Sequence, residues 1–153
     1  MPAGTEVPVG TGETVAVGFQ ARTTIDPDGS HQATARDVFG KAGIDHGHAR
    51  LINGAPAEVL PRLADGAYDA VILNQLDGSP EEFIVQALRL LRVGGALVIA
   101  GFLGSDAIAL DLSARDEHTN ALRALGDAVR TNEELVSVLL PMSDGLLIAI
   151  KKL

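Results

Sequence analysis

Apolar and polar residues follow two different periods along this chain, and the two periods alternate from segment to segment. Short runs of branched apolar residues are typical of strands, whereas apolar positions three or four residues apart are typical of amphipathic helices. Tyr68–Leu73 is the clearest strand, because nearly every position in it is apolar. Further strands are expected at Ala21–Asp26, His48–Asn53, Ala96–Phe102, Leu135–Met142 and Asp144–Lys152.

Ser79–Gly95 is the clearest helix in the pattern. Ser79 is placed to cap it, Pro80 suits the first turn, and the two glutamates that follow complement the helix dipole. The pair Gly94-Gly95 is expected to end it. Further helices are expected at Ser30–Ala42, with Ser30 as the N-cap, and at Pro56–Asp65 and Ser113–Asn132.

The order of these elements indicates the fold class. Strands and helices alternate until the last two strands, which follow each other closely enough to pair antiparallel. Alternation of this kind predicts an α/β fold, with a doubly wound and mostly parallel sheet covered by helices on both faces. The closing hairpin adds an antiparallel strand near one edge of the sheet.

Composition narrows the class of protein. At 153 residues one domain covering 1–153 is expected, with residues 1–6 as a disordered tail. The net charge of −8 argues against nucleic acid and anionic membrane partners. There is no cysteine, which excludes disulfides and thiolate chemistry. No apolar run reaches about 18 residues and no signal peptide is visible, so a cytoplasmic location is expected.

The opening stretch Val7–Phe19 admits three interpretations. Gly10 and Gly12 could form a cofactor-binding turn after a strand, the whole stretch could be a hairpin, or Thr14–Phe19 could itself be the first strand. Only ten residues separate Gly12 from Thr23, and a parallel crossover needs a dozen or more. The hairpin or the rearranged strand is therefore favoured over an intact cofactor turn. The stretch also lacks the Gly-Lys-Ser/Thr ending of a phosphate-binding P-loop, which argues against an unrelated nucleotide-binding domain.

Four longer stretches carry a resemblance to a known family. They are "TTIDPDGSHQATARDVFGKAGI", "AEVLPRLADGAYDAVIL", "ALRLLRVGGALVIAG" and "VLLPMSDGLLIAIKK", which occur in order between Thr23 and Lys152. Together they resemble the small cation-dependent O-methyltransferases of the catechol and caffeoyl-CoA type, which are class I enzymes that use S-adenosylmethionine. The resemblance implies a Rossmann-like methyltransferase fold, with the cofactor at the carboxyl ends of the strands.

The resemblance also implies which residues would meet S-adenosylmethionine. Gly10 and Gly12 match the turn that packs against the amino-acid part of the cofactor. Asp26 matches the acid that bonds the ribose hydroxyls, since a carboxylate accepts two hydrogen bonds from vicinal hydroxyls. Gly54, Ala55 and Pro56 match the turn that meets the adenine.

The family's metal ligands are replaced in this chain. Asn74 stands where the resemblance expects a ligand aspartate, and it is kept as a weak catalytic or cofactor-binding candidate. Leu76 stands at the second aspartate, and Ala100-Gly101 replaces an Asp-Asn pair. A hard cation wants several oxygen ligands, so no tight Mg²⁺ site is expected. Asp77 and Asp106 lie nearby in sequence and are interpreted as loop acids.

No other residue stands out as a catalytic base. His46 and His48 are interpreted as surface histidines, and His118 as an exposed residue on a polar helix. Lys151 and Lys152 are interpreted as solubilising charges.

Two functions remain open at this point. The first is a methyltransferase that acts on a small-molecule hydroxyl without a metal, or in impaired form. The second is a non-catalytic member of the family that serves as a binding or dimerisation module. The resemblance further implies helices before the first strand, for which this chain has too few residues. Apolar sheet surface left uncovered usually finds a partner, so a homodimer is expected.

Overall fold

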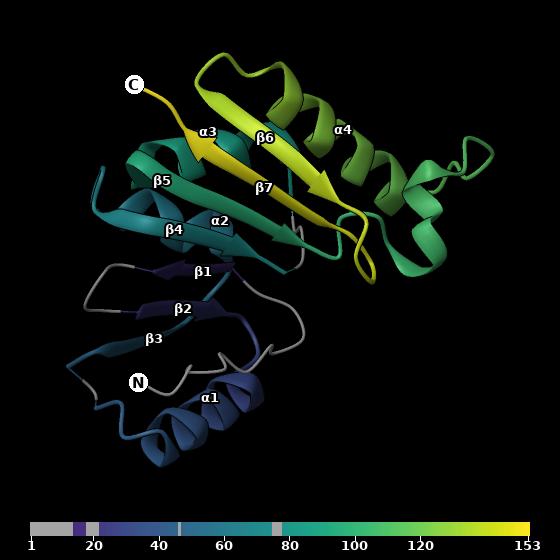
Figure 1. Cartoon of the computed structure of the whole chain (residues 1–153). Helices are drawn as coiled ribbons and strands as arrows, with labels where there is room; N and C mark the ends of the chain where they lie inside the picture. The colour runs from purple at the N-terminus through teal and green to yellow at the C-terminus, as the bar shows by residue number, and fades with distance from the viewer. Residues whose placement is uncertain (1–13, 18–21, 46, 75–77) are drawn as a thin grey trace.

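A seven-stranded mixed sheet forms the centre of the computed structural model, which describes residues 14–17, 22–45, 47–74 and 78–153 (Figure 1). The strand order is β3-β2-β1-β4-β5-β7-β6. The strands are β1 (Thr14–Val17), β2 (Arg22–Asp26), β3 (Ala49–Asn53), β4 (Tyr68–Leu73), β5 (Leu91–Ala100), β6 (Leu135–Leu140) and β7 (Leu146–Lys151). The registers give β2 to β6 one common direction, and only β1 and β7 run against it. The expected doubly wound, mostly parallel α/β fold is confirmed.

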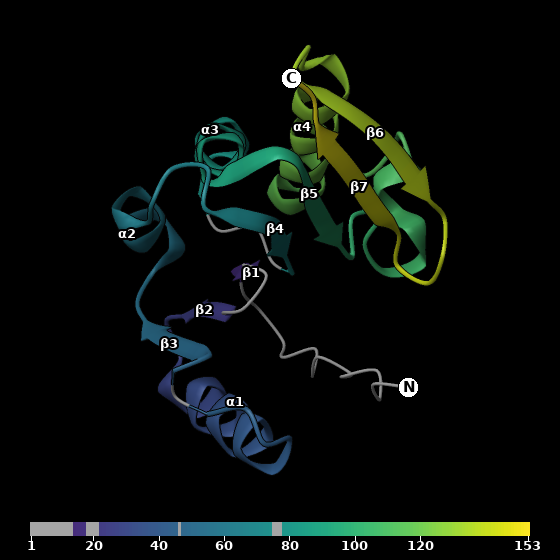
Figure 2. The same ribbon diagram turned by 60° about the vertical axis from the view of Figure 1, so that its left-hand side comes forward.

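Helices cover both faces of this sheet, but unequally. The helices are α1 (Gly29–Lys41), α2 (Pro56–Val59), α3 (Pro80–Leu90) and α4 (Glu117–Thr131), with 3-10 turns η1 (Leu60–Arg62) and η2 (Ser105–Leu110). Figure 2 shows α2, α3 and α4 along one side of the sheet and α1 on the other, beside β2 and β3. Right-handed crossovers produce this division, because the chain reverses its direction across the sheet after β3. None of the helices in the described part of the chain could span a membrane.

β1 decides between the interpretations of the opening stretch. Residues 7–13, with Gly10 and Gly12, lie outside the described residues. Thr14–Val17 is hydrogen-bonded antiparallel to β2 on one edge and to β4 on the other. Both edges are therefore occupied, so the hairpin with Val7–Val9, one of the two favoured interpretations, is wrong. The other favoured interpretation, a rearranged first strand, is supported over Thr14–Val17.

The clearest helix is shorter than its pattern suggested. α3 ends at Leu90, and β5 begins at the next residue, so Gly94 and Gly95 belong to the strand. Tyr68 lies opposite Leu91 while Ala70 lies opposite Ala96, so β5 bulges over this stretch. Gly94 has a φ of +78°, which suits the bulge and not a helix end.

Two other helices begin at acids that the pattern did not single out. Asp28, and not Ser30, is the N-cap of α1, and its side chain accepts from the Ser30 backbone N–H at 2.8 Å. Asp116 caps α4, which therefore starts four residues later than expected. Carboxylates satisfy the free N–H groups of a first turn as well as serine does.

The core lies between the sheet and helices α3 and α4. Alternate strand residues point into it, including Val71, Leu73, Leu97 and Ile99, each at most 2% exposed. Leu125 of α4 is fully buried against them. Lys151 is not a merely solubilising charge, since its Nζ donates to the carbonyls of Leu88 and Leu91, at 2.7 and 3.0 Å. It thereby satisfies free carbonyls at the end of α3.

Candidate functional site

Asp26 ends β2 at the carboxyl edge of the sheet. It is 1% exposed, and its Oδ1 accepts a hydrogen bond from the backbone N–H of Asp28 at 2.7 Å. Its Oδ2 lies 2.9 Å from Nδ1 of His31, on the first turn of α1. Buried carboxylates need such partners, and two contacts leave further lone pairs on the oxygens. Asp26 is thus a buried acceptor at the edge where open α/β sheets bind ligands.

The turn after β3 lies beside Asp26. The Gly54 backbone N–H donates to the Asp26 carbonyl at 3.0 Å, which joins the ends of β2 and β3. A Cβ on Gly54 would lie 3.0 Å from Cγ2 of Val59, so the turn packs closely on α2. Ala55 is the N-cap residue of α2, and Pro56 occupies its first turn. The three residues matched to adenine binding therefore begin at Gly54, which is hydrogen-bonded to the residue matched to ribose binding.

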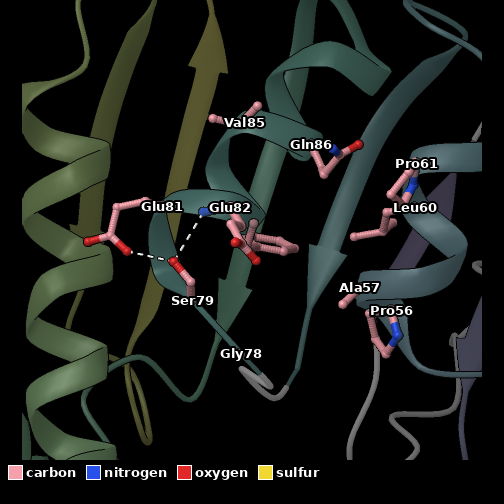
Figure 3. A pocket seen from close by; sticks show the side chains of 11 residues that line it. Pro56, Ala57, Leu60, Pro61, Gly78, Ser79, Glu81, Glu82, Val85 and Gln86 are labelled. Atoms are coloured by element: carbon pink, nitrogen blue, oxygen red, sulfur yellow. Dashed lines mark hydrogen bonds between the residues drawn. The ribbon is translucent and has the colours of Figure 1, made fainter.

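A cavity of about 500 Å³ separates α2 from α3, with Pro56 and Ala57 on one wall and Gly78 and Ser79 near its lower end (Figure 3). Of the adenine candidates only Pro56 lines it; Gly54 and Ala55 do not. Leu60 and other apolar groups form much of the remaining wall. The cavity is large enough for a heteroaromatic ring and suits one by its chemistry.

Polar contacts fix both walls of this cavity. Ser79 Oγ donates to Oε2 of Glu81 at 2.7 Å and accepts from the Glu82 backbone N–H, as the dashed lines in Figure 3 show. The Ser79 hydroxyl lowers the pKa of Glu81. Arg89 of α3 donates to the carbonyls of Leu60 and Leu63, at 2.6 and 2.8 Å. These bonds hold η1, which directly follows α2, against α3. They thereby set the distance between the two walls of the cavity.

A second cavity, of about 270 Å³, lies at the carboxyl ends of β4 and β5. Asn74 follows β4, and Ala100-Gly101 ends β5, so the structure brings together the positions matched to the family's metal ligands. Leu76 and Asp77 lie outside the described residues. His118, on the first turn of α4, lines the same cavity. Sequence reasoning missed this role, although a crossover helix must start at the edge where the preceding strand ends.

These residues do not fit a hard divalent cation. Asn74 and His118 are the only polar side chains among the described residues of this cavity's wall, and neither is a carboxylate. No group of three or more His, Cys, Asp or Glu that could hold a metal occurs in the described ranges. Asp106 is exposed and lines neither of the two cavities. Mg²⁺ prefers near-octahedral oxygen ligands, which this wall does not supply.

His48 lines neither of the two cavities. His48 is exposed, and its Nδ1 lies 2.7 Å from Oδ1 of Asp45. The imidazole of His48 lowers the pKa of that carboxyl through this hydrogen bond. His46 lies outside the described residues.

Comparison with known proteins decides the family. The family model described as O-methyltransferase matches residues 20–152. The chain belongs to the O-methyltransferase family. A Mycolicibacterium smegmatis protein named "Putative O-methyltransferase" is 42% identical over 130 residues, which are 84% of this chain and 61% of that protein. The chain thus spans about three fifths of such relatives.

Solved structures share the fold of this chain. A Corynebacterium glutamicum protein is 34% identical, with a TM-score of 0.76 over 86% of this chain and 60% of the other. The O-methyltransferase from Bacillus cereus, solved in complex with S-adenosylhomocysteine, is 14% identical and gives a TM-score of 0.74. That likeness covers 85% of this chain and 62% of the Bacillus protein, and it shows a shared fold.

Proposed function

We propose that this chain binds S-adenosylmethionine and supports methyl transfer to a hydroxyl of a small molecule, without a tightly held divalent cation. Membership of the O-methyltransferase family supports the reaction class. The observation that carries the proposal for this chain is the buried Asp26 carboxylate, which ends β2 and is bonded through its carbonyl to the turn that leads into the larger cavity.

The residues fit the cofactor in their chemistry. Asp26 Oδ1 and Oδ2 keep lone pairs for the vicinal hydroxyls of a ribose, and His31 holds the carboxylate in place from α1. Pro56 and Leu60 offer apolar surface on which an adenine can rest. When bound, S-adenosylmethionine supplies an electrophilic methyl group. The protein's part is to place an acceptor oxygen in line with that group and to exclude water.

The test is release of S-adenosylhomocysteine during incubation with S-adenosylmethionine and a panel of small phenols and alcohols, with EDTA or with Mg²⁺. Turnover that EDTA leaves unchanged is expected. Micromolar Mg²⁺ or Mn²⁺ binding that an Asn74→Ala substitution abolishes would overturn the metal-free part. Cofactor binding without turnover of any acceptor would instead indicate a non-catalytic binding module.

A second copy of this chain is the partner we propose. Residues that alternate with the core positions form an apolar face on the opposite side of the sheet. Val98 of β5 lies beside Ile148 of β7, which lies beside Val138 of β6. Val136 and Val138 are 60% and 51% exposed. These positions carry no charge, although the chain has a net charge of −8, so two copies can meet here with little repulsion.

The size of this face sets the expected affinity. The three strands β5, β7 and β6, spaced about 4.8 Å apart with about six residues each at about 3.3 Å per residue, cover roughly 300 Å². A standard stable interface buries about 800 Å² on each partner. The homodimer is therefore expected to be weak, with a dissociation constant in the micromolar range. The cytoplasmic location and the single domain remain predictions from the sequence.

A further inference from the structure

The smaller cavity combines apolar walls with one titratable side chain. Its walls include Leu73 and Ile99 from the strands and Leu122 from α4. Its polar side chains among the described residues are the Asn74 amide and the His118 imidazole. The cavity lies at the edge of the sheet where β4 and β5 end. β2 ends at the same edge, with Asp26 as its last residue. An acceptor bound here would lie at the same edge as the proposed cofactor.

The fold anchors the helix turn that carries His118, whose own side chain lines the cavity and is exposed. Asp116 caps α4, with Oδ1 accepting from the Thr119 backbone N–H at 2.9 Å and Oδ2 from the Thr119 hydroxyl at 2.6 Å. Thr119 is 1% exposed, so the first turn of α4 is anchored directly next to His118. Arg123 donates to the carbonyls of Ala109 and Ala114, at 3.0 and 2.7 Å, which ties the preceding loop to the helix.

We infer that His118 is the general base that takes the proton from a phenolic acceptor in the proposed methyl transfer. This inference rests on the proposed function. The acceptor oxygen forms a bond to the methyl carbon while the carbon–sulfur bond breaks, and S-adenosylhomocysteine leaves as a neutral thioether. The phenolic proton passes to the His118 imidazole, which later returns it to water.

The chemistry favours a base over a metal ligand. Imidazole is the side chain whose ordinary titration range lies nearest to neutral pH, and general bases work best there. One imidazole and one amide are too few ligands for Mg²⁺. A phenol suits the site because its hydroxyl, with an ordinary pKa of about 10 as in tyrosine, is within reach of an imidazole base. The leucine walls suit its ring, and the Asn74 amide can hold a further oxygen.

Charged groups lie next to His118 in the chain. Asp116 and Glu117 adjoin it on α4, and the His118 charge contributes to lowering the pKa of Asp116, after the two hydrogen bonds from Thr119. From the strands, Asn74, Ala100 and Gly101 bring no charge to the cavity. His118 thus has acidic neighbours at the start of α4, whereas the strand residues that line the cavity with it are uncharged.

The test compares the wild type with His118→Gln and His118→Ala, and uses His48→Gln as the matched control on a distant exposed histidine. The expected result is a kcat lowered by roughly 10²- to 10⁴-fold in both His118 variants. The acid limb of the wild-type pH profile should disappear, and added imidazole should restore part of the His118→Ala rate. His48→Gln should behave as the wild type.

A binding readout is independent of turnover. 4-Nitrophenol is titrated with protein and S-adenosylhomocysteine slightly below neutral pH, and the phenolate absorbance is recorded. The wild type should raise the phenolate fraction of the bound probe, and His118→Gln should not. S-adenosylhomocysteine affinity should be equal in all four proteins. If the wild type fails to bind S-adenosylhomocysteine, the proposed function fails; if all proteins bind it and His118→Gln keeps the wild-type rate and phenolate signal, this inference alone is wrong.

Discussion

The turn between β6 and β7 supports the end of β5 that lines the smaller cavity. Gly145 in this turn has a φ of +86°, and a Cβ built on it would lie 2.5 Å from Cγ and 2.8 Å from the backbone nitrogen of Leu103. The Leu103 backbone N–H donates to the Asp144 carbonyl at 2.7 Å, so the two segments are already in contact. A Gly145→Ala substitution should therefore push this turn away from the end of β5.

Two terms set the size of the effect. A left-handed backbone conformation costs a residue with a Cβ about 1–2 kcal/mol. Overpacking against buried atoms typically costs a further 1–3 kcal/mol, and Leu103 is only 3% exposed. The Gly145→Ala variant should lose roughly 2–5 kcal/mol of unfolding free energy. Gly66 is the matched control, because its φ is +60° but a Cβ there would meet nothing within 4 Å.

Urea unfolding followed by circular dichroism measures both variants. Gly66→Ala should show the backbone term alone, about 1–2 kcal/mol. In a protein of this size 1 kcal/mol corresponds to about 2–4 °C, so the melting temperatures should also separate. Equal losses in Gly66→Ala and Gly145→Ala would show that the turn is not packed on Leu103, and the account of the end of β5 would be wrong.

Three further predictions concern other contacts. The Thr119 hydroxyl and backbone N–H hold the pKa of Asp116 below its ordinary value of 3.8, so the stability from this cap is present above pH 3.8 and is lost as the pH falls through the lower folded value. Thermal melts between about pH 5 and about pH 2.5 should show a smaller acid loss for Asp116→Asn, and an unchanged loss would contradict this. Lys151→Met removes two hydrogen bonds to carbonyls at the end of α3 and should cost roughly 1–3 kcal/mol in urea unfolding, so a loss below experimental error would refute that role. Val138→Lys should abolish dimers in sedimentation velocity while Ser137→Lys, on the other face of β6, should not, and a wild type that stays monomeric at high micromolar concentration would exclude the dimer.

The period of apolar residues was enough to predict most of the fold. The strand at Tyr68–Leu73 and the closing antiparallel pair follow from local pattern, because both depend on which face each residue buries. The end of α3 could not be predicted from local pattern, because Leu91 continues the apolar stripe of the helix but is paired with Tyr68 in the sheet. Long-range pairing overrides local propensity at such a boundary.

The position of β1 also depended on long-range pairing. Thr14–Val17 is a strand both in the hairpin and in the rearranged-strand interpretation, and only the pairing with β2 and β4 selects the second. A strand that runs against its neighbours needs no crossover helix, which explains why the four residues between Val17 and Arg22 are sufficient.

The candidate site was predicted in part. Asp26 and the turn at Gly54 were matched to cofactor binding through the family resemblance, and the structure places both at the edge where β2 and β3 end. His118 was missed because it lies on a polar helix face and more than forty residues after Asn74 in the chain. Only the crossover that returns α4 to the carboxyl edge brings the two into one cavity.

Isothermal titration with S-adenosylhomocysteine tests the central claim, that this chain keeps a cofactor site at Asp26. The account predicts binding at micromolar strength to the wild type, and its loss in Asp26→Ala and in the nearly isosteric Asp26→Asn, with both variants folded by circular dichroism. Absence of binding to the folded wild type at millimolar ligand would contradict it, and so would equal binding by both variants.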